Sequence, residues 1–153
     1  MFWDYTKRIW IMLKKGFLFA SCILVLPFVV YGKGNTKFVA SLKDAAQLNV
    51  NARGSVDAIL DDETSKLKIS GSYEYFGSNA TEILILTEGT EAPLCTFKPP
   101  YNATNSPWKD WGSCDLNVNQ KKDLNAGKLY ILIKTIDRTE GQVRGSIVAE
   151  SKK

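Results

Sequence analysis

The sequence predicts an all-β fold, an antiparallel β-sandwich of about seven or eight strands, preceded by an N-terminal hydrophobic leader helix. Three observations lead to this prediction. Apolar and polar residues alternate through much of the chain after residue 32, as they do in strands with one buried face. Short polar turns such as 61–64 separate these stretches. An uncharged apolar run over 16–31 precedes all of them and follows Lys14 and Lys15.

The longest expected strand spans 65–76, and its inward-facing residues are Leu67, Ile69, Gly71, Tyr73 and Tyr75. The other expected strands are 37–43, 55–61, 82–87, 128–136 and 141–150. In the last of these, one face carries Val143, Gly145, Ile147 and Ala149. Prolines and aromatic residues interrupt the alternation over 97–113, which is expected to be a long loop that could carry short strands at its ends. Residues 119–127 are expected to form a helical turn or a loop that ends at Gly127.

The N-terminal segment 1–32 is expected to direct export. A positive start followed by an apolar run is typical of a secretory signal, and cleavage after Gly32 would begin the mature domain 33–153 at Lys33. Met12 is an alternative start that would give a compact signal peptide. The same segment could instead stay as a membrane anchor, although its apolar run is shorter than the roughly 20 residues of a comfortable span. The expected location is therefore secreted or extracytoplasmic, with contact to a membrane only through an uncleaved leader.

The charge distribution argues against a nucleic-acid partner. The chain has a net charge of +4, but residues 1–32 hold one acid, Asp4, and four bases, which are Lys7, Arg8, Lys14 and Lys15. The rest of the chain is close to neutral and has no long basic run that could neutralise phosphates.

The residue inventory also narrows the chemistry. The chain has no histidine, which is the usual general base near neutral pH and the commonest metal ligand. Its three cysteines, one of them in the leader, are too few for a four-cysteine zinc site. No metal, no cofactor and no enzymatic activity are expected. The acidic stretch Asp61-Asp62-Glu63 could bind calcium through carboxylate oxygens, but a solvated turn explains the same residues.

Cys95 and Cys114 are the cysteines outside the leader, and in an exported protein two such residues predict one disulfide. It would close a loop of about 20 residues and contribute about 3 kcal/mol in the chain-entropy model. Two free thiols are the alternative. Asn79 and Asn102 each begin an N-glycosylation sequon, and both lie in expected turns.

Aromatic residues gather within the same stretch, namely Phe97, Tyr101, Trp108 and Trp111. If they are exposed, Tyr101, Trp108 and Trp111 would form a binding platform for a sugar or a protein. If they are buried, they cover the open end of the sandwich as a small core.

The order of these features resembles that of a chordin-type (CHRD) domain over 38–147. The most specific similarity is at the C-terminal end, where LNAGKLY over 124–130 and GQVRGSI over 141–147 resemble the family's Gly-x-x-Tyr strand and its closing Gly-x-x-Arg-Gly-x-Ile motif. The resemblance implies an immunoglobulin-like β-sandwich and an extracellular role. Arg144, within the closing motif, is expected to pair with a carboxylate or a backbone carbonyl, or alternatively to bind a ligand.

The chain departs from the family's usual pattern at its histidines, whose places are taken by Ile85, Thr87 and Lys134. Whatever those histidines do elsewhere, metal binding included, is therefore not implied here. Taken together, these features favour a non-catalytic extracellular domain that binds or scaffolds an unidentified protein or carbohydrate. The alternatives are an enzyme or metal-dependent protein on the same fold, and a membrane-anchored structural protein of the cell envelope.

Overall fold

The computed structural model describes residues 34–46, 51–99 and 104–151. The expected leader therefore lies outside the described residues, and so do Tyr101 and the sequon residue Asn102. Among the residues that are described, no helix is long and apolar enough to cross a membrane.

The regular secondary structure in the described part of the chain is almost entirely strand, with a single short helix, α2 (Val118–Asn125). Its strands are β1 (Asn35–Asp44), β2 (Arg53–Asp61), β3 (Lys66–Glu74), β4 (Ala80–Thr87), β5 (Cys95–Phe97), β6 (Ser106–Asp115), β7 (Leu129–Thr135), β8 (Val143–Ser146) and β9 (Val148–Ala149). Neighbouring strands run antiparallel in the order β5-β4-β7-β8-β1-β2-β3-β6, and β9 pairs with β1. The predicted all-β antiparallel architecture is confirmed.

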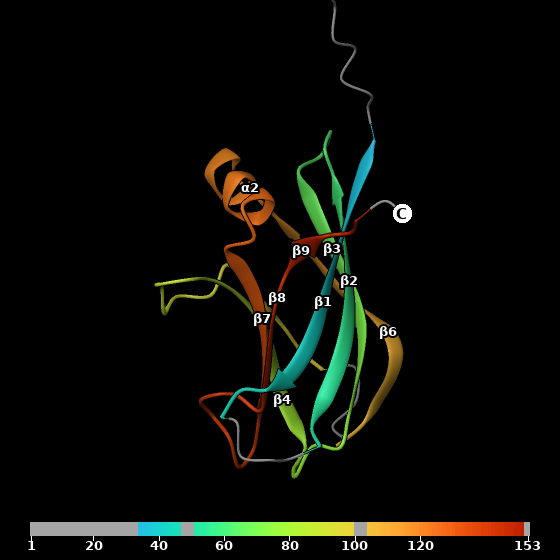
Figure 1. The fold of residues 1–153 in the computed structure, drawn as a ribbon, viewed down its shortest axis with the longest axis vertical. Helices are drawn as coiled ribbons and strands as arrows, with labels where there is room; N and C mark the ends of the chain where they lie inside the picture. The colour runs from blue at the N-terminus through green and yellow to red at the C-terminus, as the bar shows by residue number, and fades with distance from the viewer. Residues whose placement is uncertain (1–33, 47–50, 100–103, 152–153) are drawn as a thin grey trace, which may run out of the picture. The chain divides into compact units, whose positions relative to one another are not determined.

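This continuous sheet folds over so that its two halves enclose one core. Figure 1 shows β1, β2 and β3 side by side with β6 next to them, while β7, β8 and β4 lie together in the other half. Alternate residues of the regular strands point inward: Phe38 and Leu60 come from the first half, and Ile85 and Ile131 from the second. All are almost completely buried, and each such side chain contributes about 1.5–3 kcal/mol of hydrophobic stabilisation.

The helix α2 lies between β6 and β7 in sequence. It shows that this segment, which was expected to be a helical turn or a loop, is helical. Asn117 caps its N-terminus: the Asn117 side chain accepts from the Gln120 N–H at 3.0 Å, and the Gln120 side chain accepts from the Asn117 N–H at 2.8 Å. Gly127, with φ of +69°, follows the helix, as the sequence predicts for its end.

The stretch 97–113 was expected to be a loop that could carry short strands at its ends, and that expectation is wrong from Ser106 onward, where the ten-residue strand β6 begins. Proline is tolerated here because β6 ends the strand order and is paired only with β3. The alternation is lost because the β3–β6 register shifts twice, once near Ser70 and again after Gly71. Asp110 accepts the N–H of Gly112 at 2.9 Å within this irregular segment.

The C-terminal strand also differs from the prediction. Val143 and Gly145 face inward in β8, and Ile147 is fully buried, but Ala149 is exposed. The alternation of buried residues continues through Ile147, whose N–H donates to Leu129 O on β7, and it ends in β9, which pairs with β1. The segment therefore pairs with both β7 and β1 as β8, and with β1 alone as β9.

A candidate binding groove at the end of the β1–β2–β3–β6 half

A groove of about 760 Å³ lies on the outer face of the sheet where β1 ends, β2 begins, β3 ends and β6 begins. Its lining consists of Ser41, Leu42, Lys43, Arg53, Gly54, Ser55, Ser72, Tyr73, Glu74, Tyr75, Asn105, Ser106, Pro107 and Trp108. This volume is within the usual range for small-molecule sites, about 300–1,000 Å³. Of the gathered aromatic residues that the structure describes, which are Phe97, Trp108 and Trp111, Trp108 lines it.

The floor of the groove carries hydroxyl groups. Ser41 lies opposite Ser55 in the β1–β2 register, and Ser55 lies opposite Ser72 in the β2–β3 register. The three serines therefore form one row across three strands on the solvent-facing side. Each hydroxyl can donate one hydrogen bond and accept others.

Two exposed aromatic side chains border the groove. Trp108 is 47% exposed and Tyr75 is 56% exposed. Tyr75 was expected to face the core, but β3 ends at Glu74 and the Tyr75 backbone has φ of +62°, which breaks the alternation of the strand. The Tyr75 N–H donates to Asn105 Oδ1 at 2.7 Å, and the next N–H, that of Phe76, donates to Thr104 O at 3.1 Å.

A non-glycine residue with positive φ is uncommon, and such strain often accompanies a functional site. At Tyr75 the strained backbone has the effect of placing a large aromatic side chain beside the groove and in solvent. Alternation alone would have put the same side chain in the core.

Charged residues stand at the end of the groove. Arg53 Nε donates to Glu74 Oε1, and the guanidinium of Arg53 lies 5.0 Å from the centre of the Tyr75 ring. Lys43 lies directly opposite Arg53 in the β1–β2 register. Within the part of the chain that the structure describes, no carboxylate forms an ion pair with Lys43.

The groove rests on a packed aromatic base. Tyr73 is 1% exposed, and its ring stacks on Phe76 with centroids 4.6 Å apart. Burial raises the pKa of the Tyr73 phenol, and a hydrogen bond with Ser106 opposes this effect. Trp111 lies near Tyr73, with ring centroids 6.4 Å apart, and is only 7% exposed. Trp111 therefore packs in the core, like Phe97, and offers no open face to a ligand.

Arg144 lies outside the groove, on β8. Its guanidinium bonds to Glu88 at 2.8 Å and lies 3.7 Å from the centre of the Tyr130 ring. Of the roles expected for Arg144, the structure shows the carboxylate pair.

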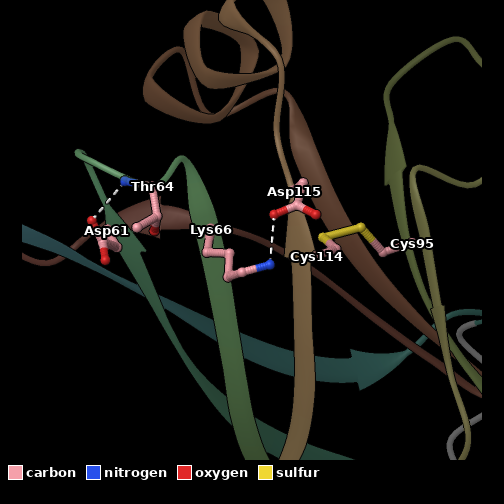
Figure 2. Close-up of polar contacts among 6 residues, drawn as sticks. All are labelled: Asp61, Thr64, Lys66, Cys95, Cys114 and Asp115. Carbon is pink, nitrogen blue, oxygen red and sulfur yellow. Dashed lines mark hydrogen bonds and ion pairs between the residues drawn. A yellow bond between two sulfur atoms is a disulfide. The ribbon is translucent and has the colours of Figure 1, made fainter.

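The predicted disulfide between Cys95 and Cys114 is confirmed. It joins β5 to β6, which are the two ends of the strand order, and so closes the sheet covalently where no ladder of hydrogen bonds does. Figure 2 shows the bond beside the ion pair of Lys66 with Asp115, whose Nζ–Oδ1 distance is 2.8 Å.

The acidic turn after β2 is held by its own hydrogen bonds. Asp61 Oδ1 accepts the N–H groups of Thr64 at 3.0 Å and Glu63 at 2.9 Å (Figure 2 shows the bond from Thr64). Bonds from the Thr64 N–H and hydroxyl and from the Glu63 N–H hold the pKa of the Asp61 carboxyl below its usual 3.8. Among the described residues, no group of three or more acidic, cysteine or histidine side chains is arranged to hold a metal ion.

The residues that replace the family's histidines do not converge. Ile85 is fully buried and Thr87 follows it on the inner face of β4. Lys134 lies on the outer face of β7, where its Nζ is 3.5 Å from Glu82 Oε2. Asn79, the sequon residue in the described part, is half-buried, and its carbonyl accepts the N–H of Ile136 at 3.0 Å.

Comparison with known proteins agrees with this fold. The CHRD domain family matches residues 38–147, from the core residue Phe38 on β1 to Ile147 just after β8. The chain therefore belongs to the CHRD-domain family. No curated protein sequence matches it.

Proposed function

We propose that this chain is a non-catalytic, extracellular CHRD-domain protein that binds a partner through the groove beside Tyr75 and Trp108. The observation that carries the proposal is the pair of exposed aromatic side chains at the rim of a preformed hollow with a polar floor. Exposed tryptophan and tyrosine commonly anchor ligands, because their rings combine a large apolar surface with a polar tip.

Two further features support the extracellular part of the proposal. The disulfide between Cys95 and Cys114 is of a kind that forms and persists in oxidising compartments outside the cytosol. The apolar segment 16–31 has the composition of an export signal or an anchor. Mass spectrometry of the protein from fractionated cells tests the location, and a cytoplasmic product with reduced cysteines would contradict it.

The binding part is tested with the full-length protein, immobilised and exposed to the extracellular material of its native source, proteins and glycans together. Trp108→Ala and Tyr75→Gly each remove one of the two aromatic side chains at the rim of the groove. The glycine variant also relieves the positive φ, so a loss of binding there does not reflect backbone strain. Val118→Ala, at a 65% exposed position on α2, is the matched control.

The expected result is a component that the unaltered protein and the Val118 variant retain and that both rim variants release. Equal retention by all four proteins would contradict a binding role for the groove. Turnover of a substrate by the purified protein in a broad hydrolase screen would favour the enzyme alternative instead.

A further inference from the structure

We infer that the ligand of the groove is an acidic oligosaccharide, whose sugar ring stacks on Trp108 and whose carboxylate or sulfate lies at Lys43. This inference rests on the proposed binding function and names its ligand class. Three properties of the groove support it: the aromatic rim, the hydroxyl floor and an unbalanced positive charge.

The combination of rim and floor suits a sugar better than a protein. A pyranose ring presents C–H groups on its faces, which can pack on an aromatic ring, and hydroxyls around its edge. The row of Ser41, Ser55 and Ser72 offers hydroxyls that both donate and accept, as sugar hydroxyls do. A protein partner would instead favour an apolar centre with a polar rim, and this groove has the opposite arrangement.

The groove is also preformed. Its floor consists of three paired strands, and Asn105 fixes the backbone of Tyr75 by a 2.7 Å hydrogen bond. Little ordering of the protein backbone is then needed on binding, which lowers the cost of forming the complex.

The charge arrangement indicates that the ligand is acidic. Like charges directly opposite each other on neighbouring strands destabilise a sheet, and Lys43 is opposite Arg53. Glu74 balances Arg53, but no described carboxylate pairs with Lys43. An anionic group bound at Lys43 would offset the repulsion and form a charge-assisted hydrogen bond.

The test is calorimetric titration of the full-length protein with oligosaccharides of equal length that are neutral, carboxylated or sulfated, and with an oligoglutamate peptide. The carboxylated or the sulfated sugar is expected to bind about tenfold more tightly than the neutral one, the gain of one charge-assisted bond. The arm that binds more tightly identifies the acidic group.

The variants separate the two contributions. Lys43→Gln should abolish the preference for acidic sugars over neutral ones, whereas Trp108→Ala should weaken binding of every sugar by about tenfold or more. Lys122→Gln makes the same charge change on α2, away from the groove, and should alter neither. Urea unfolding of each variant shows that the fold is kept.

The outcomes distinguish this inference from the function on which it rests. Equal affinity for neutral and acidic sugars, or equal binding of oligoglutamate and acidic sugars, would overturn the acidic-oligosaccharide assignment. Binding of a protein alone, lost in Trp108→Ala, would overturn it and leave the proposed function standing. If no ligand of any kind depends on Trp108 for binding, the acidic-oligosaccharide inference and the proposed binding function are both wrong.

Discussion

Removing the disulfide by Cys95→Ala with Cys114→Ala should destabilise the domain by about 3–4 kcal/mol. The two cysteines are 19 residues apart, and closing a loop of that size in the unfolded chain contributes about 3 kcal/mol in the chain-entropy model. Cys95 is 8% exposed, so truncating it also removes packing inside the core, which costs about 1 kcal/mol. Changing both cysteines together avoids leaving a reactive thiol.

Urea unfolding, followed by tryptophan fluorescence that changes as the buried Trp111 becomes exposed, measures this loss. The unaltered protein provides the matched comparison, because a reductant should shift its unfolding midpoint towards that of the double variant. The same reductant should leave the double variant unchanged.

The reasoning would be refuted by a loss below about 1 kcal/mol, since that is smaller than the typical range for a native disulfide. Alkylation of both cysteines in the native protein without reductant would refute it more directly.

Three smaller perturbations test the packing and the acidic turn. Gly71→Ala should cost about 1–3 kcal/mol in urea unfolding, because the new Cβ would lie 2.6 Å from the Ser55 carbonyl oxygen. Gly141→Ala should destabilise the fold similarly, since its φ is +131° and the site is crowded. Hydrogen bonds led by the Thr64 N–H lower the pKa of Asp61, so NMR titration should give a value below 3.8. The stability that Asp61 contributes should be present above the unfolded pKa and lost as pH falls through the lowered value.

The sandwich could be predicted from sequence because each strand carries its own local pattern. Inward-facing residues such as Leu67 and Ile69 recur at every second position, and the structure buries both completely. The disulfide could be predicted because two cysteines outside the expected leader allow a single pairing within the domain.

β6 escaped prediction for a physical reason. Two register shifts against β3 change which face each side chain occupies, so Pro107, Trp108 and Asp110 read as a loop. A period-2 pattern holds only while the ladder is regular.

The groove was mostly missed because its parts are far apart in sequence and ordinary when taken singly. Ser41, Ser55 and Ser72 each read as a solvent-facing strand residue, and only strand register places them in one row. Tyr75 continued an inward alternation that its backbone φ interrupts. Trp108 was found because an unusual density of aromatic residues is visible in sequence alone.

Loss of the Cys95–Cys114 disulfide should not affect ligand binding in the groove, although both features involve β6. Cys114 is six residues from Trp108 along the chain, about 20 Å in an extended strand. Near the groove, β6 is held by its own pairing with β3, in which Tyr73 lies opposite Ser106. The disulfide therefore acts mainly on the unfolded chain and on the opposite end of β6.

It follows that the double cysteine variant, at a urea concentration where it is still folded, should bind the groove's ligand with the same affinity as the unaltered protein. Calorimetric titration of both proteins at that urea concentration checks this. The Trp108→Ala variant shows how large the loss of affinity is when the groove itself is altered. A comparable loss in the double variant would mean that the β5–β6 closure shapes the groove across the length of β6. The β3–β6 ladder alone would then be too weak to fix Trp108 in place.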